Sequence, residues 1–73
     1  MVYVYSKPNC APCKMVKNHL TAEGITFEER DITKNPDFIQ EIKDLGFNSV
    51  PVTVSARMEP ILDFQPTLLD KLK

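Results

Sequence analysis

The sequence has no tryptophan, only one histidine, and no apolar run long enough to cross a bilayer. Basic and acidic residues nearly balance, nine against ten, and the lysines and arginines are scattered along the chain. This distribution is not that of a nucleic-acid-binding protein. The first residues carry neither a basic lead nor a small-residue cleavage site. We therefore expect a cytoplasmic protein with no nucleic-acid partner and no membrane association.

Cysteine is also scarce, because the chain has only Cys10 and Cys13, with two residues between them. Cytoplasmic thiols are kept reduced, so a permanent structural disulfide is not expected. A structural zinc site needs four ligands, but there is no second cysteine pair and His19 lies six residues beyond Cys13. A metal half-site and an incidental pair remain alternatives. The spacing favours redox chemistry without a metal, and His19 is expected to be a plain surface residue of a helix.

The first half of the chain predicts a strand, a helix and a second strand. At 73 residues we expect a single domain, residues 1–73, in which all elements share one core. Alternating β-branched and aromatic residues predict a strand over residues 2–5. Apolar positions three and four apart predict a helix over residues 12–23, which Gly24 ends. Side chains also alternate over residues 25–32, with more charged residues than a central strand usually has, and this alternation predicts a second strand.

The clearest helix signal follows this second strand. Asn35 supplies an N-terminal cap and Pro36 fits the first turn of a helix. The apolar face that follows extends to Leu45, and Gly46 comes directly after it. These residues predict a helix that ends before Gly46.

The last third of the chain predicts a hairpin and a terminal helix. Residues 51–54 and 58–61 are short extended runs joined by three residues, which favours an antiparallel pair. The leucines within residues 66–72 predict a helix that docks on the sheet. Because a βαβ unit makes a parallel pair, the order βαβαββα predicts an α/β protein with a four-stranded mixed sheet and helices on both faces.

The two cysteines lie where the first predicted strand turns into the first predicted helix. Free N–H groups and the positive end of the helix dipole stabilise a thiolate at that point. We therefore predict that the pKa of the Cys10 thiol is below its ordinary value and that Cys10 is the exposed nucleophile. Cys13 lies one turn inside the helix on its buried side, which predicts that it resolves a mixed disulfide on Cys10.

The segment Y-S-K-P-N-C-A-P-C at positions 5–13, together with S-V-P at 49–51, resembles the glutaredoxin family over nearly the whole chain. Phe-Gln-Pro at positions 64–66 makes the chain most similar to the NrdH-type redoxins, glutaredoxin-like proteins that pass electrons to ribonucleotide reductase. The resemblance implies a thioredoxin fold, with four strands in a mixed sheet flanked by three helices.

The same resemblance implies the residues that surround the cysteine pair. It implies that the Val50–Pro51 bond is cis, that this loop faces the pair, and that the Val50 backbone pairs with an extended substrate segment. It also places Lys7 beside the nucleophile, where a cation lowers the pKa of a thiol. Considered alone, Pro51 has the alternative explanation of a rigid proline before a strand, and a lone lysine such as Lys7 is more often a solvated charge. The remaining expected substrate contacts are Asn9, Ala11 and Pro12.

The residues near the cysteines and after the hairpin indicate whether thioredoxin reductase or glutathione is the electron donor. Pro12 precedes Cys13 as in thioredoxins, whereas glutaredoxins that bind glutathione have tyrosine between the cysteines and a Gly-Gly plus an acidic pair after the hairpin. This chain has neither the tyrosine nor the Gly-Gly with an acidic pair. At positions 61–63 it has Ile-Leu-Asp where the NrdH pattern has Trp-Ser-Gly.

We therefore predict a monomeric thiol-disulfide oxidoreductase that is reduced by thioredoxin reductase and reduces ribonucleotide reductase or another disulfide protein. It is expected to bind no cofactor and to use a redox-active Cys10–Cys13 disulfide. The alternatives are a glutathione-dependent glutaredoxin and a module that holds an iron–sulfur cluster between two protomers.

Overall fold

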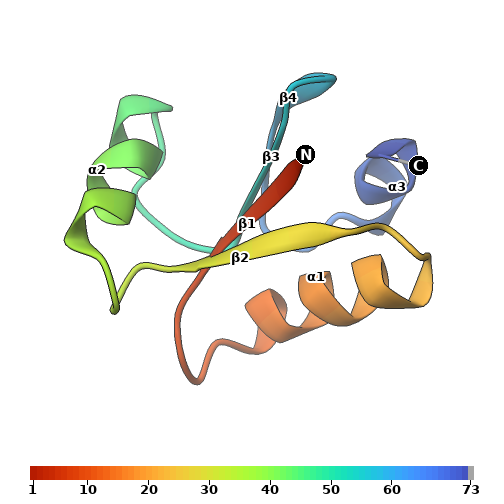
Figure 1. Cartoon of the computed structure of the whole chain (residues 1–73), viewed down its shortest axis with the longest axis horizontal. Helices are drawn as coiled ribbons and strands as arrows, with labels where there is room; N and C mark the ends of the chain where they lie inside the picture. The colour runs from red at the N-terminus through yellow and green to blue at the C-terminus, as the bar shows by residue number, and fades with distance from the viewer. Residues whose placement is uncertain (73) are drawn as a thin grey trace.

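The computed structural model describes residues 1–72, so Lys73, the last residue of the expected domain, lies outside the described residues. The described chain forms one mixed sheet and three helices, the last of which continues as a short 3-10 turn (Figure 1). The strands are β1 (Val2–Ser6), β2 (Phe27–Asp31), β3 (Val52–Ser55) and β4 (Met58–Leu62). The helical elements are α1 (Ala11–Ala22), α2 (Pro36–Asp44), α3 (Pro66–Leu69) and the 3-10 turn η1 (Asp70–Leu72).

The sheet has the strand order β2-β1-β3-β4. β1 runs parallel to β2, which follows from the helical crossover between them, and Val2 pairs with Phe27 at its start. β1 is antiparallel to β3, and β3 is antiparallel to β4. This pairing confirms the predicted four-stranded mixed sheet and the order βαβαββα.

The two faces of the sheet are covered by different helices. α1 and α3 lie on one side and α2 on the other (Figure 1). One cluster of buried residues joins Val4 of β1 to Leu20 of α1 and Leu69 of α3. A second cluster joins Tyr5 of β1 to Ile42 of α2. Successive side chains of a strand point to opposite faces, so the alternation in β1 supplies both clusters.

The high charge of the second predicted strand has a structural explanation, because β2 is an edge strand. Arg30 of β2 lies over the ring of Tyr3, with its guanidinium carbon 4.1 Å from the ring centroid. Its Nη1 donates to Glu41 Oε1 of α2 at 2.7 Å. Tyr5 donates its hydroxyl to the same Glu41 oxygen at 2.6 Å. The charged strand therefore holds α2 against the sheet.

Several predicted details were wrong. The hairpin turn has two residues, because Ser55 belongs to β3 and pairs directly with Met58. Leu45 caps α2 and is 43% exposed, because the helix ends one residue before it and its side chain leaves the buried face. The terminal helix is α-helical only as far as Leu69. None of the helices formed by residues 1–72 is long and apolar enough to span a bilayer.

His19 is not the plain surface residue that the sequence predicts. Its ring lies edge-on to Phe64, with centroids 5.8 Å apart. Its Nε2 is 2.8 Å from Asp70 Oδ1 at the end of the chain, and its side chain is 21% exposed. His19 therefore fastens the terminal helical segment to α1. A sequence pattern within one helix contains no information about such a distant partner.

Candidate active site

The loop between β1 and α1 sets the position of Cys10. Asn9 adopts a positive φ of 58°, a conformation that asparagine tolerates better than most residues. Cys10 then caps α1 in an extended conformation, and its sulfur accepts a hydrogen bond from the Cys13 N–H at 3.3 Å. Pro12 lies in the first turn, where a helix does not need its missing N–H. The sulfur of Cys10 is therefore held at the positive end of the α1 dipole.

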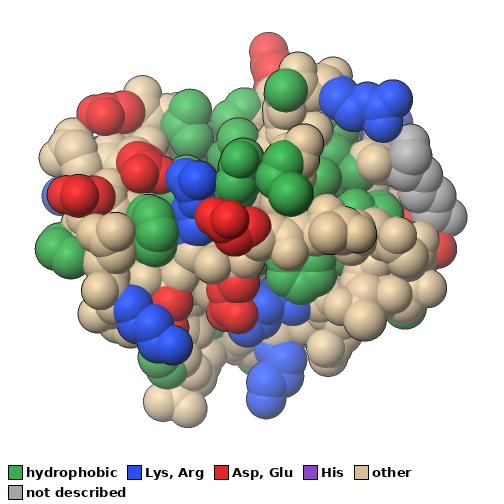
Figure 2. Space-filling view, in the orientation of Figure 1, with side chains coloured by type: hydrophobic (Ala, Val, Ile, Leu, Met, Phe, Trp, Pro, Cys, Tyr) green, Lys and Arg blue, Asp and Glu red, His purple; other side chains and the backbone are tan. Residues whose placement is uncertain are grey.

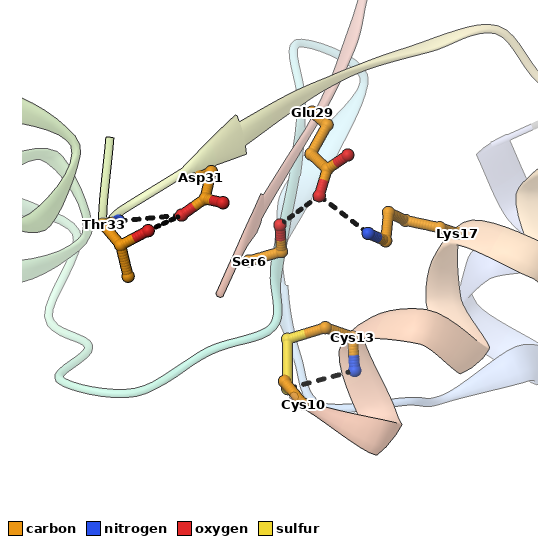
Figure 3. Close-up of polar contacts among 7 residues, drawn as sticks. All are labelled: Ser6, Cys10, Cys13, Lys17, Glu29, Asp31 and Thr33. Atoms are coloured by element: carbon orange, nitrogen blue, oxygen red, sulfur yellow. Dashed lines mark hydrogen bonds and ion pairs between the residues drawn. A yellow bond between two sulfur atoms is a disulfide. The ribbon is translucent and has the colours of Figure 1, made fainter. Parts of the chain in front are cut away.

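Cys10 and Cys13 form a disulfide, with their Cα atoms 5.2 Å apart (Figure 3). Cys10 is partly exposed, whereas Cys13 is 1% exposed. Cys13 belongs to the buried cluster that includes Tyr5 and Val52, and Cys10 packs against the edge of that cluster. Cys10 is therefore accessible to a partner molecule, whereas Cys13 is buried behind it.

The loop before β3 lies against the cysteine pair, as the family resemblance implies. The Val50–Pro51 peptide bond is cis, and both residues are buried. Val50 belongs to the same cluster as Cys13. The Pro51 carbonyl accepts a hydrogen bond from the Asp63 N–H at 3.0 Å, which joins this loop to the one between β4 and α3.

Asp63 itself has a positive φ of 62°. The NrdH pattern has glycine at this position, and glycine is the residue that adopts such a conformation without strain. Aspartate is one of the few other residue types that are enriched in this region.

The remaining expected site residues divide into two groups. Lys7, Asn9 and Ala11 are exposed and line a groove beside Cys10. Pro12 is partly buried and does not line that groove. The groove and the loop that contains Val50 are therefore separate surfaces, and Cys10 borders both of them.

A polar cluster near the disulfide was not predicted from the sequence. Glu29 of β2 accepts hydrogen bonds from Lys17 Nζ of α1 and from Ser6 Oγ of β1, each at 2.7 Å. Figure 3 shows these side chains converging between β2 and α1, on the side of the sheet where the disulfide lies. The bond from Lys17, followed by that from Ser6, holds the pKa of Glu29 below its ordinary value. The cluster therefore contains a carboxylate anion, which ties α1 to the sheet.

The cysteines do not belong to any cluster of metal ligands in residues 1–72. The one group of potential ligands found there comprises His19, Glu23 and Asp70, from the end of α1 and from η1. The chemistry that the cysteine site can perform without further groups is thiol–disulfide exchange. Each exchange forms one S–S bond and breaks another.

Comparison with known proteins agrees with this chemistry. The glutaredoxin family model matches residues 2–56. The glutaredoxin-like protein NrdH of Lactococcus lactis is 40% identical over 72 residues, which cover 99% of each chain. The gene 56 protein of mycobacterium phage L5 is 46% identical over 72 residues, or 97% of this chain and 70% of the phage protein.

The solved structures include an NrdH-redoxin from Escherichia coli with a TM-score of 0.91. The match covers 99% of this chain and 93% of that one at 21% identity, and it shows that the two proteins share the thioredoxin fold. Taken together with the disulfide at the start of α1, the sequence matches show that this chain belongs to the glutaredoxin family, as an NrdH-like thiol-disulfide oxidoreductase.

Proposed function

We propose that the protein is a cytoplasmic electron carrier that thioredoxin reductase reduces and that in turn reduces ribonucleotide reductase or another disulfide protein. It acts as a monomer, as one domain and without a bound cofactor, so that the Cys10–Cys13 pair alone carries the electrons. The observation that carries the proposal is the asymmetry of this pair, with a partly exposed Cys10 capping α1 and a buried Cys13 behind it. The full-length match to an NrdH protein supports the choice of partners.

The reaction proceeds in two exchanges. The Cys10 thiolate attacks one sulfur of the substrate disulfide, which forms a mixed disulfide and releases the other substrate sulfur as a thiolate. The thiolate of Cys13 then attacks Cys10 Sγ and displaces the second substrate thiolate. The substrate gains two electrons, and the protein is left with the Cys10–Cys13 disulfide. Thioredoxin reductase restores the dithiol with two electrons from NADPH.

Three features activate Cys10 in this scheme. The Cys13 N–H donates to its sulfur, the dipole of α1 favours negative charge there, and Lys7 adds a cation at the groove beside it. Each favours the thiolate over the thiol. Because Cys13 is buried, it reaches a sulfur only after Cys10 has brought one to it.

The substrate segment is held around Cys10 by the surrounding backbone. Val50 offers main-chain hydrogen bonds to an extended segment, in the manner of strand addition. Pro51 fixes the shape of this loop. The expected contacts that flank the cysteines are Asn9, Ala11 and Pro12.

A coupled assay tests the electron donor. With its cognate thioredoxin reductase and NADPH, the protein is expected to reduce a protein disulfide such as insulin at a rate that rises with its concentration. With glutathione, glutathione reductase and NADPH, we expect little or no NADPH oxidation, because the segment after the hairpin lacks the glycines and the acidic pair through which glutaredoxins hold glutathione. The Cys10→Ser variant is the blank for both arms. Efficient turnover in the glutathione arm alone would show a glutathione-dependent glutaredoxin.

The activation of Cys10 is tested by titration. In the Cys13→Ser variant, we expect the pKa of the Cys10 thiol to lie below the value of about 8.5 for a free cysteine. Thiolate absorbance measured against pH reports it directly. A matched Cys13→Ser/Lys7→Gln variant should titrate at higher pH because one cation is removed. A midpoint at or above the free value would contradict the proposed activation.

A further inference from the structure

The groove beside Cys10 is larger than a single thiol requires. It has a volume of about 660 Å³ and is formed by the loop before α1 and the outer surface of the first two turns of that helix. Lys7 and Asn9 line it from the loop, and Lys14, Met15 and Asn18 line it from the helix. It therefore extends from the reactive sulfur along α1.

The groove is lined by positively charged side chains, although the net charge of the chain is -1. Three lysines and no acidic residue line it. Lys17 is neutralised by Glu29, at 2.7 Å. Lys7 and Lys14 are exposed and have no ion pair within residues 1–72. Figure 2 shows basic side chains in several places, and one of these places is the lower edge of the view, where α1 begins in Figure 1. The groove thus presents two cations that no acidic group of residues 1–72 neutralises.

The other lining groups suit a polypeptide. Met15 is 49% exposed, and its flexible thioether adapts to apolar side chains of varied shape. Asn9 and Asn18 offer amide donors and acceptors that match those of a peptide backbone. A groove with cations, amides and a few exposed apolar side chains fits an acidic peptide segment better than an apolar ligand.

We propose that this groove binds an acidic polypeptide segment next to the reacting disulfide of the substrate protein, with its carboxylates near Lys7 and Lys14. The inference rests on the proposed function and adds to it the chemical class of the preferred substrate. Because Cys10 itself lines the groove, a segment seated there brings an adjacent disulfide to the nucleophile. Long-range attraction between opposite charges also speeds the encounter.

Matched peptides test this inference. Three peptides with the same internal disulfide carry glutamate, glutamine or lysine at the flanking positions, and the pre-reduced protein is mixed with each. At about 0.01 M salt, where the screening length is about 30 Å, we expect the glutamate peptide to be reduced roughly tenfold faster than the glutamine peptide. At about 1 M salt the screening length falls to about 3 Å, and the two rates should converge.

Variants assign the effect to the groove. Lys14→Gln should lower the glutamate-to-glutamine rate ratio roughly threefold, the size typical of one exposed ion pair, whereas Lys14→Arg should preserve it. Lys71→Gln removes the same charge from η1, outside the groove, and should leave the ratio unchanged.

Equal rates for the glutamate and glutamine peptides in the unmodified protein would overturn the inference, and so would a ratio that Lys14→Gln does not change. In both cases the glutamine peptide would still be reduced. Failure of the proposed function looks different, because then no peptide would be reduced at any salt concentration.

Discussion

Replacing Cys13 with serine is expected to stop the reaction at the mixed disulfide between Cys10 and the substrate. The variant retains the partly exposed thiol that we propose as the nucleophile and loses the buried thiol that we propose resolves the adduct. The trapped species should accumulate to nearly one equivalent when the variant is mixed with a disulfide protein. A non-reducing gel after alkylation, with mass spectrometry of the joined peptides, measures it.

The matched variant is Cys10→Ser, which should trap nothing and have no measurable reductase activity. Its remaining thiol, Cys13, is 1% exposed and so inaccessible to a protein disulfide. The unmodified protein should show only a transient adduct. If both variants trapped substrate to the same extent, the roles assigned to the two cysteines would be wrong.

Truncating Leu20 to alanine is expected to lower the free energy of unfolding by about 3 kcal/mol. Leu20 lies on α1, is fully buried, and packs in the cluster that joins this helix to the sheet and to α3. A loss of this size should lower the melting temperature by more than about 10 °C in a domain of this length. Thermal and urea unfolding followed by circular dichroism measure both quantities.

Leu45→Ala is the control for this substitution. It removes the same atoms from a side chain that is 43% exposed, so it should cost less than about 1 kcal/mol. Since Cys10 caps α1 and Cys13 lies within it, the Leu20→Ala variant should also lose its reductase activity at a lower temperature than Leu45→Ala. Equal effects of the two substitutions would contradict the assignment of Leu20 to the core.

The elements that the sequence predicted well are those whose evidence is local. The alternation in residues 2–5 reflects a strand that contributes to a buried cluster on each face of the sheet, and the spacing of apolar residues in α1 reflects a helix packed on that sheet. The position of Cys10 before a helix follows from the same local pattern. These features led directly to the order of the elements along the chain and to the chemistry of the site.

The features that were missed depend on contacts between distant segments. In the sequence, Glu29 is one more charged residue of a strand. Its partner Lys17 becomes evident only from the packing of α1 against the sheet. The groove lysine Lys14 lies four residues after Cys10 and Lys17 three residues later, a spacing that places all three on one side of a helix. That spacing could have pointed to the groove. The sequence alone did not indicate that a loop would form its other wall.

The disulfide closes a very small ring, because it joins residues only three positions apart. A cross-link stabilises a fold chiefly by restricting the unfolded chain, and the effect grows with the length of the loop that it closes. For a loop of about four residues the chain-entropy relation gives about 2 kcal/mol, against about 4.7 kcal/mol for one of 100 residues. Most of the stability therefore comes from the two buried clusters, which do not depend on the bond between the sulfurs. We therefore expect the reduced and the disulfide forms to share nearly the same shape, so that an electron donor and an electron acceptor would meet nearly the same surface.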